Sequence, residues 1–193
     1  MKIVVLAGGI STEREVSLVS GNGICRALRA IGHRAVLVDM FLGLEEVPED
    51  MEALFDAPDG LIREVRVHAQ APDLDAVRRQ RSGQRSHLGP HVLEACAAAD
   101  LVFLGLHGQD GEDGRIQAAL DLMGVPYTGA GHLASALAMD KAMAKRLMDA
   151  GGIRTPKWQL LEYGPEDGER LGAERPMPCG GRTTGGGSSL GAY

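Results

Sequence analysis

His107 stands where this sequence gives the strongest sign of chemistry. It follows an apolar run, residues 101–106, which is short and bounded by turn residues, as in a buried strand of a parallel sheet. A polar loop with regularly spaced glycines, residues 108–114, comes next, and apolar residues at helical spacing follow from Ile116 on. Open α/β sheets bind ligands where the carboxyl end of a strand meets a helix N-terminus. The sequence therefore predicts a ligand site at His107.

A run of three charges, Glu13, Arg14 and Glu15, is the second candidate. It follows a predicted first strand, residues 2–7, and the turn Gly8–Gly9, where a helix is expected to begin. The turn lacks the spacing GxGxxG, so a dinucleotide fingerprint is absent. Judged without its neighbours, such a run is most often a solvated surface, and this alternative stays open here.

A parallel sheet must bring the two candidates together. We expect strands at residues 2–7, 34–39 and 101–106 to be adjacent, with a helix between the first two that ends at Gly32–His33. The loops after the first and third strands are therefore expected to share one ligand site. The expected apolar side of the first helix consists of Val16, Val19, Ile24, Leu28 and Ile31.

Residues 40–99 carry less information, and we assign them no function. They contain a weak strand pattern at residues 61–67 and a predicted helix over residues 90–98. The basic segment 78–85 lacks interleaved aromatic residues and is interpreted as a solvated loop. The histidines of this part lack the spacing of metal ligands and are interpreted as surface or packing residues: His68, His87 and His91.

Beyond the central loop the sequence predicts shorter elements and a glycine-rich end. A strand, two helices and a further strand are expected, over residues 124–129, 135–137, 140–150 and 157–161. Lys141 and Lys145 are four residues apart on one helix face, which is typical of exposed lysines. Residues 176–191 fit a flexible tail and a loop that wraps phosphates equally well.

The composition is that of an ordinary globular protein and argues against several function classes. The 193 residues carry a net charge of -6, whereas nucleic-acid binding needs a basic face. No apolar run approaches the roughly 20 residues of a membrane span, and the N-terminus lacks a signal-peptide pattern, so a cytoplasmic location is expected. The three distant cysteines, Cys25, Cys96 and Cys179, support neither a disulfide framework nor a metal site.

Six motifs in order resemble those of the D-alanine–D-alanine ligases of the ATP-grasp superfamily. They span residues 8–191, and only about residues 40–99 and 162–181 lie outside them. Each motif alone is weak, but a chance match in this order is improbable. The motifs are Gly8–Gly9 with Ser11 and 13–17 (EREVS); 106–108 (LHG) with 111–114 (GEDG); 126–129 (PYTG); Ser135–Ala136 with 139–141 (MDK); Thr155–Pro156; and 187–191 (GSSLG).

The resemblance implies a ligase of peptidoglycan precursor synthesis that joins two D-alanines with ATP. The carboxylate of the first D-alanine would be phosphorylated, and the amine of the second would attack the D-alanyl phosphate. D-alanine and ATP are the implied ligands and Mg²⁺ the implied metal, with no nucleic-acid or membrane partner. The resemblance leaves the oligomeric state open, a homodimer included.

The resemblance also assigns roles to residues. The expected substrate-binding residues are Glu13, Ser17 and His107. Glu13 would receive the ammonium group of the first D-alanine by a charge-assisted hydrogen bond. Ser188 would tie Glu13 to the reacting end, so that Glu13 and Ser188 are the expected catalytic residues. The expected contacts to ATP are Lys141, Arg182, Gly187, Ser188 and Ser189.

The sequence departs from the family in two respects. The family has an apolar strand ending in Lys-Pro before the glycine loop. In this sequence Arg182 stands at about the place of that lysine, and it follows two glycines, which are poor strand formers. The family also continues beyond the point where this chain ends, and the metal ligands are expected in that part. The chain is therefore interpreted as an N-terminal fragment or a truncated product, and the 193 residues alone are expected to form no dipeptide.

The expected architecture is α/β, with two domains. Residues 1–128 would form a parallel-sheet, Rossmann-like pre-ATP-grasp domain that binds substrate, and residues 129–193 the beginning of an incomplete ATP-grasp domain. Two alternatives remain open: a non-catalytic remnant or D-alanine-binding module, and a relative that makes D-alanyl-D-lactate or D-alanyl-D-serine. The choice of the second substrate depends on residues that this sequence does not contain.

Overall fold

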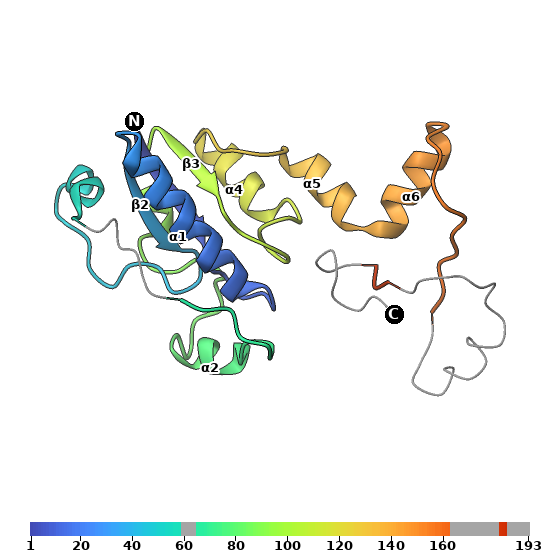
Figure 1. Ribbon diagram of the computed structural model, residues 1–193, viewed down its shortest axis with the longest axis horizontal. Coiled ribbons are helices and arrows are strands. Elements are labelled where there is room, and N and C mark those ends of the chain that lie inside the picture. The colour runs from blue at the N-terminus through green and yellow to red at the C-terminus, as the bar shows by residue number, and fades with distance from the viewer. Residues whose placement is uncertain (59–64, 163–181, 185–193) are drawn as a thin grey trace. The chain divides into compact units, whose positions relative to one another are not determined.

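A parallel three-stranded sheet forms the centre of the N-terminal part of the protein. The computed structural model describes residues 1–58, 65–162 and 182–184. The strands lie in the order β2-β1-β3, and β1 pairs in parallel with both neighbours, which confirms the predicted sheet (Figure 1). All three strands therefore end at one edge of the sheet. Their bounds are β1 (Lys2–Ala7), β2 (Arg34–Asp39) and β3 (Leu101–Leu104).

The chain divides into two compact units, Met1–Ala136 and Leu137–Tyr193. This division falls within α5, somewhat later than the domain boundary proposed after residue 128. No helix of the described residues is both long and apolar enough to cross a membrane. The helices are α1 (Arg14–Ala30), the 3-10 helix η1 (Met51–Asp56), α2 (Leu74–Arg79), α3 (Val92–Ala98), α4 (Arg115–Met123), α5 (His132–Met139) and α6 (Lys141–Ala150).

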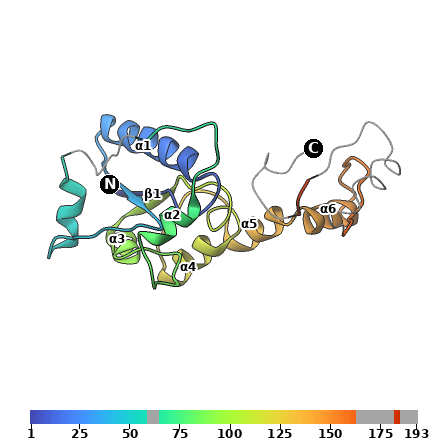
Figure 2. The ribbon, with the colours of Figure 1, turned by 90° about the horizontal axis from the view of Figure 1, so that it is seen from below.

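Helices cover both faces of the sheet. Figure 2 shows α1 on one side of the strands, with α3 and α4 on the other. Alternate side chains of β1 follow this division: Val4 and Leu6 pack in the cluster with α3, α4 and η1, whereas Ile3 and Val5 pack in the cluster with α1. A sheet buried on both faces explains why its strands are continuous apolar runs in the sequence.

The face that α1 turns toward the sheet differs from the predicted one. Val16, Val19 and Ile31 are exposed, and only Ile24 and Leu28 of the predicted apolar side pack against the core. Apart from Arg14 at the start of the helix, the buried positions are mostly small residues: Ser17, Leu18, Gly21, Asn22 and Cys25. Gly21 explains the difference, because a Cβ there would lie 2.6 Å from the Ala7 Cβ and 2.9 Å from Leu37 Cδ1. The helix lies too close to the sheet at this point for a row of large side chains.

Replacing Gly21 by Ala should therefore destabilise the protein, although Ala is the better helix former. Overpacking a tight contact costs about 1–3 kcal/mol in the free energy of unfolding. Gly23 is the matched control, because it lies in the same helix and a Cβ there would meet nothing within 4 Å. Gly23→Ala should stabilise by about 0.5–1 kcal/mol. Urea denaturation measures both, and equal effects of the two substitutions would contradict the close approach.

Several further predictions are confirmed and others are wrong. The helices expected near residues 90–98, 135–137 and 140–150 are present as α3, α5 and α6. β3 is shorter than predicted, although Gly105 still donates its N–H to the carbonyl of Leu6 at 2.8 Å. Residues 157–161 form no strand, because nothing in the described part of the chain pairs with their backbone. The weak strand pattern at 61–67 lies mostly outside the described residues.

The basic segment at residues 78–85 is exposed except at Arg81, which agrees with a solvated surface, although the segment is not entirely a loop. Its first two residues end α2, and the Arg81 guanidinium lies 4.9 Å from the centre of the Phe41 ring. Arg81 also donates to the carbonyls of Phe41 at 2.7 Å and Leu88 at 3.1 Å. Arg81 therefore fastens the chain after α2 to the segment that follows β2.

Cys25 and Cys96 are both buried, and neither forms a disulfide in the described part of the chain. Burial raises the pKa of the Cys96 thiol to about 12, so this group stays protonated. Cys179 lies outside the described residues.

Candidate functional site

The loops that follow β1 and β3 are joined at the carboxyl edge of the sheet. The Ser11 hydroxyl donates to the carbonyl of His107 at 2.8 Å. The Ser17 hydroxyl donates to the carbonyl of Gly105 at 2.7 Å and accepts the N–H of Gly8 at 2.9 Å. These bonds confirm that His107 and the Gly8–Gly9 turn share one edge, as expected from the order of the strands.

Glu13 presents an unsatisfied carboxylate oxygen at this edge. It occupies the N-cap position of α1, but its side chain caps no backbone N–H of the helix. Its Oε2 atom is buried and has no hydrogen-bond partner among the described residues. A buried acceptor without a partner is costly, and more so when it carries charge. A ligand with positively charged N–H donors would supply what this oxygen lacks.

Gly108 packs closely against the Glu13 carboxylate. Its φ is +73°, in the left-handed region that side chains rarely adopt. A Cβ at this position would lie 2.8 Å from Glu13 Oε2 and 3.3 Å from the Ser11 hydroxyl oxygen. Any side chain here would therefore both strain the backbone and block the buried oxygen.

His107 lies on the same loop and remains partly accessible. Its side chain is 36 % exposed, and its Nδ1 atom is 4.0 Å from Glu112 Oε1. The other carboxylate oxygen of Glu112 accepts the N–H of Gly108 at 3.1 Å. Glu112 thus holds the start of the loop and places a carboxylate near the imidazole.

Ser17 has no hydrogen available for a ligand in this structure. The residue is 0 % exposed, and its hydroxyl joins the backbones of Gly8 and Gly105. The family resemblance implies that Ser17 contacts the substrate directly. We propose instead that Ser17 positions the loops of the site. Ser17 ties the two loops of the site to α1.

Glu15 pairs away from Glu13. Its carboxylate accepts the backbone N–H of His68 at 2.7 Å and lies 2.8 Å from the His68 Nδ1 atom. The backbone N–H first, and then the imidazole, lower the pKa of the Glu15 carboxyl from its usual value. Glu15 is therefore paired with a residue that lies 53 positions away in the sequence, and not with a local partner.

Arg14, the middle residue of the three-charge run, has a structural role. Its guanidinium is buried and forms an ion pair with Asp39, at the end of β2. It also donates to the carbonyl of Gly9 at 2.5 Å. Asp39 Oδ1 accepts the N–H groups of Phe41 and Leu42, each at 3.0 Å. The sequence signal that could have indicated this pair is Asp39, a single carboxylate at the end of an otherwise apolar strand.

The residues expected to contact ATP belong to the second unit. Lys141 is the first residue of α6, and its backbone N–H donates to the carbonyl of Thr184 at 3.0 Å. Asp140 caps this helix by accepting the Met143 N–H at 2.9 Å. Arg182 is exposed. Gly187, Ser188 and Ser189 lie outside the described residues, so the structure does not place them.

A family model described as the D-ala D-ala ligase N-terminus matches residues 2–130, which include the sheet and both loops of the site. The chain belongs to the D-alanine–D-alanine ligase family. Curated relatives named D-alanine–D-alanine ligase agree: one from Lacticaseibacillus casei (strain BL23) is 41% identical over 100% of this chain, and one from Pediococcus pentosaceus is 42% identical over 99%. This chain covers 54% of each of these relatives and thus spans about half their length.

Solved structures of ligases have the same fold. The D-alanine–D-alanine ligase from Coxiella burnetii matches 100% of this chain with a TM-score of 0.59 and 27% identity. A ligase from Bacillus anthracis gives a TM-score of 0.58 at 26% identity, and a structure of the B. anthracis ligase complexed with ATP gives 0.53 over 89% of the chain. The chain covers 46–55% of these three structures, so the ligase family is established for this half.

Proposed function

We propose that this chain provides the first-substrate site of an ATP-dependent D-alanine–D-alanine ligase. The whole enzyme would join two D-alanines into D-alanyl-D-alanine for peptidoglycan precursors. Family membership supports the reaction, and the edge of the sheet with Glu13 and His107 supports the place of the first D-alanine. The unpartnered, buried Glu13 Oε2 is the single observation that carries this assignment.

An ammonium group fits this oxygen better than a neutral donor. It brings a positive charge and three N–H donors to a buried carboxylate, so the hydrogen bond is charge-assisted. The absence of a side chain at Gly108 keeps a Cβ from coming within 2.8 Å of Oε2. We assign His107, on the same loop, to the rest of the same amino acid, where its accessible imidazole can donate a hydrogen bond to the substrate carboxylate.

The proposed reaction has two steps. An oxygen of the first D-alanine carboxylate attacks the γ-phosphorus of ATP, which gives D-alanyl phosphate and ADP. The amine of the second D-alanine, once deprotonated, attacks the acyl carbon, and inorganic phosphate leaves as the peptide bond forms. In this scheme Glu13 binds the ammonium group of the first D-alanine, and this fixes the carboxylate of that D-alanine for both steps.

ATP is the proposed co-substrate, supported by the related B. anthracis ligase that was solved in complex with ATP. Lys141 at the start of α6 and the exposed Arg182 remain the proposed ATP contacts in the described residues, with Gly187, Ser188 and Ser189 beyond them. The described residues contain no group of three or more His, Cys, Asp or Glu side chains suited to a metal ion. We propose Mg²⁺ as a metal of the whole enzyme only, in line with the family resemblance.

Calorimetric titration of D-alanine into the 193-residue chain tests the first-substrate site. We expect D-alanine to bind and propionate, which lacks the ammonium group, to give no detectable binding. Glu13→Gln should remove the binding of D-alanine, since the amide cannot balance the ammonium charge. Equal binding of D-alanine to Glu13→Gln and the unchanged chain would contradict the assignment. A parallel titration with an ATP analogue distinguishes a ligase half from a D-alanine-binding module.

A further inference from the structure

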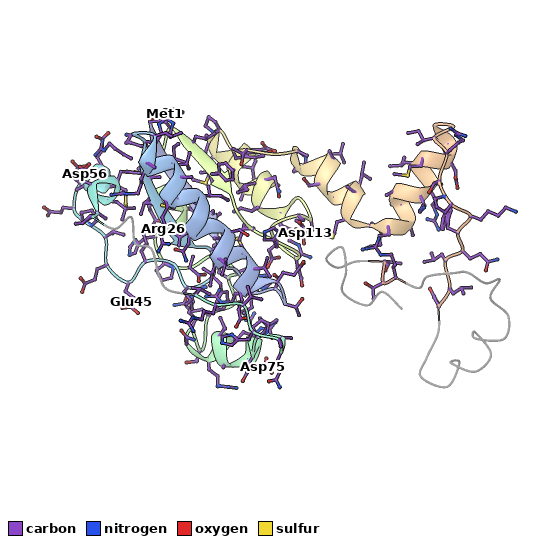
Figure 3. All side chains as sticks on the ribbon, viewed as in Figure 1. Met1, Arg26, Glu45, Asp56, Asp75 and Asp113 are labelled. Carbon is purple, nitrogen blue, oxygen red and sulfur yellow. The ribbon has the colours of Figure 1, made fainter. Side chains whose placement is uncertain are left out.

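Asp110 is a buried carboxylate inside the loop that carries His107. Its side chain is only 5% exposed, and its φ of +67° is unusual for a residue other than glycine. His87 Nδ1 lies 2.5 Å from Asp110 Oδ2, and Arg115 donates to Asp110 Oδ1 at 2.7 Å. Asp113, labelled in Figure 3 ahead of α4, accepts the Asp110 N–H at 3.0 Å. This carboxylate is therefore one of the groups that hold the loop, together with Ser11 and Glu112.

His87 holds Asp110 from outside the loop, whereas Arg115 and Asp113 lie within the loop or at its end. An ionised carboxylate only accepts hydrogen bonds, so the Nδ1 atom of His87 must carry the hydrogen and donate it. His87 follows Arg81, which is bound to the carbonyls of Phe41 and Leu88. It is thus part of a segment fixed to the chain after β2.

The same segment is fastened on the other side of His87. Gly89 donates its N–H to the carbonyl of Met40 at 2.8 Å, and Leu44 donates to the carbonyl of Pro90 at 3.0 Å. The backbones are so close that a Cβ on Gly43 would lie 2.3 Å from the Pro90 oxygen. His87 therefore projects from a segment that is hydrogen-bonded on both sides, and its own hydrogen bond links Asp110 to that segment.

We propose that His87 is a positioning residue of the first-substrate site. By anchoring Asp110, it fixes the loop so that His107 and Gly108 keep their places beside Glu13. The expectation that the site binds D-alanine rests on the proposed function, but the expected effect of His87 on the loop does not. Without His87, the buried carboxylate loses one of its two side-chain donors and moves toward water, and the backbone of the loop moves with it.

Two substitutions of His87 separate positioning from simple stability. His87→Ala removes the donor, whereas the Nδ2 atom of His87→Asn stands one bond beyond Cγ, as Nδ1 does, and can still donate. Arg85→Ala is the control, since Arg85 is an exposed residue of the same segment. The measurements are amide NMR spectra and D-alanine titrations of the 193-residue chain.

In His87→Ala we expect the amide resonances of Gly108, Gly111 and Gly114 to shift while those of β1 stay unchanged. D-alanine binding should weaken between about 10-fold and 100-fold, the range for a misplaced binding group. His87→Asn should restore both, and Arg85→Ala should change neither. Unchanged loop amides in His87→Ala, or a lowered stability without any loop shift, would overturn the proposal. If the unchanged chain binds no D-alanine, the proposed function fails, and the loop amides still decide the role of His87.

Discussion

Glu13→Gln is expected to reduce the use of the first D-alanine by about 30-fold to several thousand-fold in the complete enzyme. Leaving one charge of a buried pair without its partner costs about 2–5 kcal/mol, which corresponds to that range. The suitable enzyme is a chimaera in which residues 1–193 replace the matching half of the Lacticaseibacillus casei ligase. Steady-state kinetics with D-alanine varied at saturating ATP give kcat/KM for the amino acid.

The KM for ATP and the neighbouring carboxylate provide the controls for Glu13. The KM for ATP should change little in Glu13→Gln, because the substituted group faces the amino acid in our proposal. Glu15→Gln should have a mild effect, since the Glu15 carboxylate is occupied by His68. Equally mild effects of both substitutions would mean that residues 13–15 are a solvated charge run, and the first-substrate site would have to be placed elsewhere.

The sheet and its ligand-binding edge could be predicted because parallel strands have a simple signature. Buried strands are short apolar runs, and the connections between parallel strands place successive carboxyl ends on one edge. His107 and Gly8–Gly9 each follow such a run, so their neighbourhood followed from topology alone. Neither argument depends on which way an individual side chain points.

The partners of Arg14 and Glu15 could not be predicted from the sequence, for the opposite reason. Consecutive residues at a helix start point in directions about 100° apart, so three adjacent charges enter three environments. Glu13 has an unsatisfied oxygen, Arg14 forms a buried ion pair and Glu15 pairs with His68. The deciding partners are far away in the sequence, and spacing gives no sign of them.

His87 and the packed face of α1 show the same limit. His87 is one of several scattered histidines in the sequence, and only the fold brings it 2.5 Å from Asp110. The predicted apolar side of α1 assumed that large side chains face the core, but Gly21 lets the helix approach the sheet too closely for that. In both cases tertiary contacts overrode the local pattern.

Arg14→Met is expected to lower the free energy of unfolding by about 3–5 kcal/mol, the largest stability effect that we predict. The substitution keeps an apolar chain of similar length but leaves the Asp39 carboxylate buried with only the two backbone N–H groups that it already accepts. It also removes the donor to the Gly9 carbonyl, and so loosens the turn on which the site depends. Urea denaturation followed by circular dichroism measures the change.

The large loss of unfolding free energy expected for Arg14→Met comes from the burial of the ion pair and not from ion pairing as such. An exposed ion pair tests this claim. Arg34 forms two hydrogen bonds with Asp56, at 2.8 and 2.7 Å, but both side chains are exposed. Arg34→Met should therefore cost only about 0–1 kcal/mol. Arg14→Met combined with Asp39→Asn should be more stable than Arg14→Met alone, because the neutral amide keeps an acceptor for the backbone without a buried charge. Equal losses for Arg14→Met and Arg34→Met would show that Asp39 reaches water when its partner is removed.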